Sequence, residues 1–221
     1  MNISKQILDF LKKLHPPSNL PQDVITLNPY ADARVWPLVE KFYQIYYNSQ
    51  EKKTILFGIN PGRLGGGITG IPFTDPIRLE EDCQIPNHFD KRAELSSRFI
   101  YDMINSYGGP EKFYSRFYIS AVSPLGYMMD GKNLNYYEIP SWKQIFTDYA
   151  VDMIRQQEGF INTDMAICIG QGQNLKFLEE INKKHQFFKK IITVPHPRWI
   201  MQYRLKKKDL FIQEYLDKLS G

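Results

Sequence analysis

Four short apolar runs, separated by segments with helical spacing, most constrain how this chain folds. Each run has a length typical of a buried strand and is shorter than an ordinary buried helix. Short apolar strands that alternate with helices are typical of a parallel sheet covered on both faces. We therefore predict an α/β protein, a three-layer α/β/α sandwich around a central four-stranded parallel sheet, with strands at 54–58, 117–122, 165–169 and 190–194.

The 221 residues are enough for a single domain with a sizeable core, which we predict over 1–221. Within it, residues 1–50 form an N-terminal helical extension packed on the rest. Two stretches rich in proline, 15–29 and 74–88, are predicted to be a connector and an irregular excursion. Helical spacing of apolar residues predicts helices at 3–14, 35–47, about 93–107, 141–157, from 172 onward and at about 206–219.

Composition restricts the class of protein further. The net charge of +4 permits nucleic-acid binding, although many basic proteins bind none. The only two cysteines, Cys83 and Cys168, cannot supply a zinc or iron–sulfur set. Cys168 lies in an apolar run and is predicted to be a core residue, whereas Cys83 lies in a polar stretch and is expected to be exposed. With no signal-peptide pattern and no membrane-spanning run, we expect a cytoplasmic protein.

Residues 58–73 contain six glycines and two prolines, a composition that indicates a loop whose backbone closely approaches another group. Asn60 stands where the preceding strand ends, and Phe73 closes the segment. An amide and an aromatic ring beside exposed backbone suit a planar polar ligand such as a nucleobase. Two familiar motifs fit poorly: prolines follow the G-x-G-x-x-G match at 65–70, and Ile68 replaces the lysine of a P-loop.

Polar residues follow each predicted strand, where ligands bind in open parallel sheets. They are Asn60, the segment 120–125, Gly170-Gln171 and His196. Taken singly, Asn60 could form a turn, Phe73 could be a core ring and His196 could cap a strand end.

Taken together, Asn60-Pro61-Gly62, the run Thr69-Gly70-Ile71-Pro72-Phe73 and the late His196-Pro197 form a more specific pattern. The chain here resembles the uracil-DNA glycosylase superfamily, most closely its single-strand-selective monofunctional branch. That branch has a first motif G-M-N-P-G-x-F-G-x-x-x-T-G-V-P-F and a second motif that begins H-P. The resemblance covers most of the chain from about residue 54 onward.

The resemblance implies a role for each matching residue. Asn60 would hold the hydrolytic water near the sugar, and His196 would donate a hydrogen bond to the departing base as negative charge develops. Phe73 would stack on the extruded base, and backbone amides around Gly62 and Leu64 would cradle the base or the water.

Two departures from the family pattern affect specificity. Ala121 stands where the family reads uracil with an asparagine, so a bidentate reader of the base edge is missing. Either the pocket is wider and admits bases such as xanthine or hypoxanthine, or Ser123 or a backbone amide reads the base.

In the second motif the family continues H-P-S-P-R, whereas this chain reads His196-Pro197-Arg198-Trp199-Ile200. Arg198 and Trp199 either contact DNA, together with Arg63, or form a connector with Trp199 in the core. Asp75, near Phe73, is predicted to form a turn with Pro76 rather than to act in catalysis.

The resemblance thus implies a monofunctional glycosylase that flips uracil or another deaminated base, such as xanthine, out of single- or double-stranded DNA in base excision repair. We expect no metal, no cofactor, no membrane partner, a monomer, and activity at the bacterial nucleoid. A non-catalytic nucleic-acid-binding module and a hydrolase of free nucleosides remain alternatives, because a fold alone does not establish a function.

Overall fold

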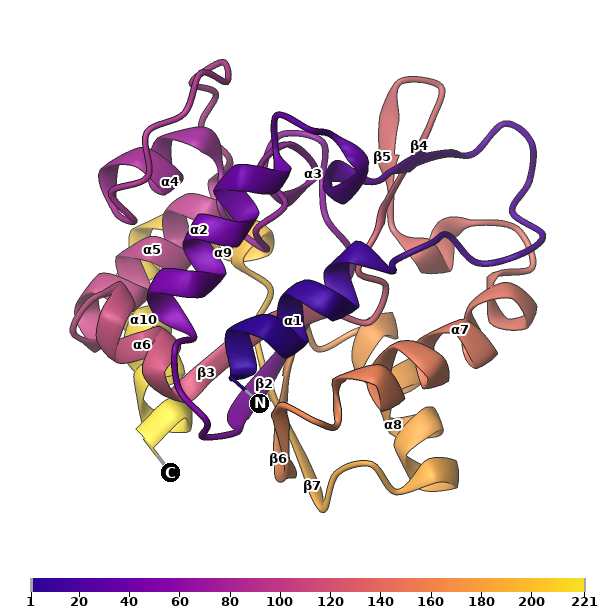
Figure 1. Ribbon diagram of the computed structural model, residues 1–221. Helices are drawn as coiled ribbons and strands as arrows, with labels where there is room; N and C mark the ends of the chain where they lie inside the picture. The colour runs from indigo at the N-terminus through magenta and orange to yellow at the C-terminus, as the bar shows by residue number, and fades with distance from the viewer. Residues whose placement is uncertain (1, 221) are drawn as a thin grey trace.

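The computed structural model, which describes residues 2–220, is built around a parallel sheet of four strands in the order β3-β2-β6-β7 (Figure 1). The predicted fold class is confirmed. Apolar side chains occupy both faces of β2 and β3, as expected for strands covered on two sides. The strand bounds are β2 (Lys53–Gly58), β3 (Phe117–Ala121), β6 (Ile161–Ile169) and β7 (Lys190–Val194).

Helices cover both sides of this sheet. Figure 1 shows α5, α6 and α10 gathered on one side and α7 and α8 on the other. The N-terminal helix α1 contacts both α2 and α7. Except for α6 (Pro110–Arg116), these helices follow the predicted apolar spacing closely, with bounds α1 (Ile3–Lys12), α2 (Trp36–Tyr46), α5 (Leu95–Tyr107), α7 (Trp142–Gln157), α8 (Gln173–His185) and α10 (Lys208–Ser220).

The four parallel strands end level with one another. Gly58 at the end of β2 pairs with Ala121 at the end of β3, and Ile169 of β6 pairs with Val194 of β7. Residues that follow the strands are therefore brought to one edge of the sheet, although they are far apart in the sequence.

A second, antiparallel sheet of three strands was not predicted. Its strands β1 (Ile25–Leu27), β4 (Gly126–Met129) and β5 (Lys132–Leu134) lie in segments expected to be loops. Each strand has only three or four residues, too few to show an alternating pattern. The hairpin turn, Asp130-Gly131, has two positive φ angles of 50° and 71°, which is the Asp-Gly type I′ turn of two-residue hairpins.

Several short helices also lie where connectors were expected. Three of them begin with a proline, which at the first helical position supports a helix instead of breaking it. The prediction for Cys83 was wrong, because this residue is buried beside one of them. The added elements are α3 (Gly66–Thr69), α4 (Pro76–Glu81), α6, α9 (Pro197–Tyr203), and the 3-10 turns η1 (Pro29–Ala31), η2 (Tyr136–Glu138) and η3 (Leu205–Lys207).

The N-terminal fifty residues support the glycine-rich segment directly. A Cβ atom added to Gly70 would lie 2.5 Å from Val39 Cγ2, so this backbone packs tightly on α2. Leu27 of β1 lies against Gly126 of β4, which in turn approaches the Pro61 carbonyl closely. The predicted helical extension therefore also supplies a strand. Within residues 2–220, no helix is both long enough and apolar enough to cross a membrane.

Candidate active site

A cavity of about 360 Å³ opens where the parallel strands end. All four strands contribute to its lining at or just after their last residue, with Asn60, Ala121, Gln171 and His196. The remaining walls come from the glycine-rich segment, the β4–β5 hairpin and the first residues of α5, α8 and α9. The volume falls within the range of about 300–1,000 Å³ that is typical of small-molecule sites. The cavity can therefore accept a flat ring the size of a nucleobase.

The amide of Asn60 is held in one orientation by the backbone that follows β5. Its Nδ2 donates to the Leu134 carbonyl at 3.0 Å, and its Oδ1 accepts from the Tyr136 N–H at 2.9 Å. Turning the amide over would place donor against donor and acceptor against acceptor. An amide oxygen can accept two hydrogen bonds, so Oδ1 retains a lone pair for a water or a ligand.

The ring of Phe73 forms one wall of the cavity and is held by an unusual backbone conformation. Its φ of 51° lies in the left-handed region, and it is followed by Thr74, whose carbonyl accepts from Thr69 Oγ1 at 2.6 Å. Thr74 Oγ1 also shares a hydrogen bond of 2.9 Å with the buried Tyr101 hydroxyl. A Cβ on Gly58 would lie 2.9 Å from the ring, so the glycine at the end of β2 lets the ring pack on the strand.

His196 lies across from that ring, with 6.2 Å between the two ring centroids. It is the N-cap of α9, where its Nδ1 accepts from the Arg198 N–H at 3.2 Å. Burial, together with the nearby Arg198 charge, lowers the pKa of His196 to about 4. The imidazole is thus neutral at pH 7, and because Nδ1 accepts, its proton is on Nε2. This arrangement provides a neutral N–H donor.

Glu94 is a cavity residue that sequence reasoning missed. Its Oε2 accepts from Ser97 Oγ at 2.9 Å, and its backbone N–H donates to Asp75 Oδ2 at 2.8 Å. Burial, with a smaller contribution from Asp75, raises the pKa of the Glu94 carboxyl. A side chain on Gly65 would overlap this carboxyl, so the glycine permits their approach. No motif surrounds Glu94 in the sequence, and only the fold brings it to the glycine-rich segment.

Arg198 and Trp199 lie on the first turn of α9 and contribute to the lining of the cavity. Trp199 is 41% exposed, so the alternative that placed it in the core is wrong. Its ring meets Phe211 edge-on at 5.8 Å, and the Arg204 guanidinium lies 4.9 Å from its centroid. Tyr203, one turn further along α9, is 66% exposed and also reaches the cavity.

Three other predicted site residues lie apart from the cavity in the described part of the chain. Ser123 is fully buried, and its Oγ hydrogen-bonds the Tyr127 hydroxyl at 2.8 Å, so its side chain does not reach the site. The side chains of Leu64 and Arg63 also lie outside the lining, although the Arg63 backbone N–H donates to Asn133 Oδ1. Asp75 caps α4, in line with its prediction as a turn residue.

Known proteins resemble this chain over most of its length. The family described as "Uracil DNA glycosylase superfamily" matches residues 45–220, which is most of the chain. This chain belongs to the uracil-DNA glycosylase superfamily. It is also similar to the crystal structure of wild-type SMUG2 from Pedobacter heparinus, with a TM-score of 0.95 and 39% identity. That match covers 100% of this chain and 97% of the other.

Membership of the uracil-DNA glycosylase superfamily gives the site its general chemistry. The family implies hydrolysis of N-glycosyl bonds, with DNA as the substrate. Among residues 2–220, no three histidine, cysteine, aspartate or glutamate side chains gather into a group that could hold a metal ion. The side chains that line the cavity include amides, serine and tyrosine hydroxyls, an indole, one imidazole, one carboxyl and one guanidinium.

Proposed function

We propose that this protein is a monofunctional DNA glycosylase that releases uracil or another deaminated base, such as xanthine, without cutting the strand. The observation that carries this proposal is the arrangement of Asn60, Phe73 and a neutral His196 around a single cavity. The target nucleotide would be flipped out of the DNA and enter this cavity, because its glycosidic bond is inaccessible inside a duplex.

In the proposed reaction the base stacks on Phe73 and its carbonyl receives the Nε2–H of His196. As the C1′–N bond breaks, the electron pair leaves with the base, and negative charge builds on that carbonyl. A donor already in place stabilises this charge, and one such donor typically contributes about 3 kcal/mol. A neutral imidazole keeps its proton on Nε2 through this step, because Nδ1 is already hydrogen-bonded to α9.

The water that replaces the base would be held by Asn60. Its Oδ1 accepts from Tyr136 and retains one lone pair for a water O–H. The water oxygen bonds to C1′ of the oxocarbenium-like sugar, and its proton is lost afterwards to the departing base or to solvent. An amide is not a strong base, but a highly dissociative reaction requires the water to be positioned more than deprotonated.

A lyase step is not part of the proposal. Such a step requires an amine that forms a Schiff base with the opened sugar. Neither motif contains a lysine, and none lines the cavity within residues 2–220. The expected product is an intact strand with an abasic site.

The residues at the inner end of β3 bear on which base is released. Ala121 lines the cavity where the family pattern has an asparagine, and Ser123 does not reach the cavity in its place. Without an asparagine side chain to read the edge of the base, the cavity would accept several deaminated bases, namely uracil, xanthine and hypoxanthine. Arg198, Trp199 and Tyr203 at the rim would contact the DNA around the extruded nucleotide.

The same missing amide favours one rival, a nucleic-acid-binding module that kept the fold and lost turnover. Base release separates the two. Labelled oligonucleotides, single- and double-stranded, would carry one uracil, xanthine, hypoxanthine or normal base and would be treated with alkali after incubation. We expect cleavage at one or more deaminated bases only. DNA binding with no cleavage at any base would support the rival, and release from free nucleosides without DNA would support a nucleoside hydrolase.

A further inference from the structure

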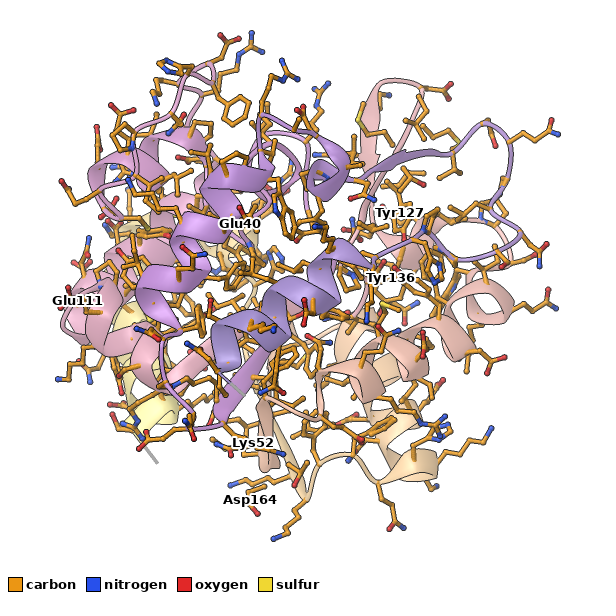
Figure 2. The ribbon with its side chains drawn as sticks, viewed as in Figure 1. Glu40, Lys52, Glu111, Tyr127, Tyr136 and Asp164 are labelled. Carbon is orange, nitrogen blue, oxygen red and sulfur yellow. The ribbon has the colours of Figure 1, made fainter. Side chains whose placement is uncertain are left out.

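Tyr136 connects the amide of Asn60 to a second, buried amide. The ring of Tyr136 is fully buried among aromatic side chains, and its hydroxyl donates to Asn174 Oδ1 at 2.9 Å. The same residue donates its backbone N–H to Asn60 Oδ1 at 2.9 Å. Figure 2 labels Tyr136 below the β4–β5 hairpin in this view. The ring neighbours are Tyr137, Trp142, Phe146 and Phe177.

Asn174 completes a closed path back to β2. It is 1% exposed at the start of α8, and its Nδ2 donates to the Gly58 carbonyl at 3.2 Å. Gly58 ends β2 only two positions before Asn60. The path therefore runs from Asn60 through Tyr136 and Asn174 to Gly58, and it joins β2, η2 and α8.

This path has a mechanical consequence for Asn60. Pairing of β5 with β4 ends at Leu134, so the backbone of residues 135–136 is held in place by contacts other than strand pairing. The Tyr136 hydroxyl holds the segment to α8, and Asn174 holds it to the end of β2. A hydrogen-bonded group stays in place against thermal motion better than one held by packing alone, because its geometry is directional.

We propose that Tyr136 and Asn174 are positioning residues that hold the Asn60 amide in its productive orientation. The inference rests on the proposed function for its effect on rate. It adds two residues outside both sequence motifs to the group on which base release depends.

The test uses Tyr136→Phe, which keeps the buried ring and removes only the hydroxyl. Tyr47→Phe is the matched control, because the Tyr47 hydroxyl is also buried and donates to the Phe117 carbonyl at the opposite end of β3. Single-turnover base release would be measured with excess enzyme, together with affinity for abasic DNA. We expect Tyr136→Phe to slow release roughly tenfold, as for the loss of one buried hydrogen bond, while Tyr47→Phe and both affinities stay unchanged. Equal rates for the two variants would overturn the proposal.

A double-mutant cycle shows whether the effect passes through Asn60. Hours-long incubations would measure the residual rate of Asn60→Ala with and without Tyr136→Phe. We expect no further loss in the double variant, since Asn60 no longer needs to be oriented. The same fold-loss in both backgrounds would mean that Tyr136 acts elsewhere and would overturn the proposal.

Hydrogen exchange of the residue-136 backbone amide needs no DNA. It therefore separates failure of this inference from failure of the proposed function. We expect faster exchange in Tyr136→Phe than in the wild type or Tyr47→Phe. Unchanged exchange would overturn the positioning role, even if the wild type released no base from any lesion.

Discussion

The two sheets both reach the cavity, but they serve it in different ways. The parallel sheet brings Asn60 and His196 to one edge because β2 and β7 end level with their neighbours. The antiparallel sheet places the backbone of residues 134–136 against the Asn60 amide. One sheet therefore determines where the functional side chains are, and the other determines how one of them is oriented.

The two sheets also differ in what holds them together. In the parallel sheet, β2 and β3 are buried along nearly their whole length and β6 is buried over residues 166–169, so hydrophobic burial stabilises its centre. The small sheet depends on β1 from the N-terminal segment, with Ile25 exposed and Leu27 packed beside Gly126. Orientation of the site thus depends on the less buried part of the molecule, whereas its position depends on the core.

The largest expected effect is at Asn60, which follows β2 of the parallel sheet and is hydrogen-bonded by the segment that follows β5 of the small sheet. Asn60→Ala should lower the single-turnover rate of base release by about three orders of magnitude, because the water would no longer be held in position for attack. Affinity for abasic DNA should stay close to that of the wild type, because the side chain makes its hydrogen bonds to the protein backbone. If the variant released base at the wild-type rate, Asn60 would have no role in the mechanism. The small sheet would then have no effect on the reaction through this residue.

A second test concerns the parallel sheet alone. His196→Ala should slow release by roughly a hundredfold or more, since it removes the donor to the departing base. It also removes the N-cap of α9, at a cost of about 1 kcal/mol in stability. His196→Ser can cap the helix without donating into the cavity, so it should regain Tm but not rate. If His196→Ser recovered the release rate, the rate would depend on the helix cap at residue 196 and not on hydrogen-bond donation to the base.

A third test concerns the small sheet. A Cβ on Gly126 would overlap the Pro61 carbonyl, so Gly126→Ala should push β4 away from the glycine-rich segment. Because a shift of about 1 Å at a reacting group can cost about a hundredfold, we expect a loss of roughly tenfold or more in the release rate.

Gly131→Ala is the matched control for this test. Gly131 has a φ of 71° at the hairpin tip, and a Cβ there would meet nothing within 4 Å. The substitution strains the turn by about 1 kcal/mol but leaves residues 134–136 in place, so Tm should fall and the rate should not. Equal rate losses in the two variants would show that hairpin stability, not its contact with Pro61, governs the site.

The effect at Phe73 should be smaller and should fall on substrate binding. Phe73→Ala removes a stacking contact worth about 1–3 kcal/mol per base. We therefore expect KM to rise by about tenfold or more, with kcat less affected. Steady-state kinetics on a single-stranded uracil oligonucleotide would measure both, and an unchanged KM would place the ring in a purely structural role.

The last prediction concerns pH, on which we expect the rate of base release to depend little. Because His196 has a pKa of about 4 in the folded protein, release should show no inflection near the ordinary histidine value of about 6.5. Stability should depend on pH. Between pH 4 and pH 6.5 the histidine is protonated more in the unfolded chain than in the folded protein. The contribution of His196 to the free energy of unfolding is therefore complete above about pH 6.5 and is lost as pH falls toward 4. Urea unfolding of the wild type and His196→Ser from pH 7 to pH 5 would compare the two, and the variant should lack this part of the decline.

The sequence predicted the parallel sheet well, for a physical reason. Buried strands and amphipathic helices have periodic apolar patterns that are readable locally, and the ends of parallel strands meet at one edge. Asn60, Phe73 and His196 were singled out as candidates on this basis, and all three line the cavity, while their roles are proposals. The placement of Ser123 at the site was not supported, because a strand pattern does not show which way a side chain turns after its strand ends.

By itself, the sequence determined the α/β class, the order of the main elements and the residues that follow each parallel strand. Only the tertiary structure decided the small sheet, the approach of Glu94 to the glycine-rich segment, and the path from Asn60 through Tyr136 to Asn174. The Asp130-Gly131 pair was the local signal for the hairpin. Its partner strand β1 lies about a hundred residues away in the chain. Contacts between such distant, short segments leave no periodic pattern in either one, so they appear only when the chain has folded.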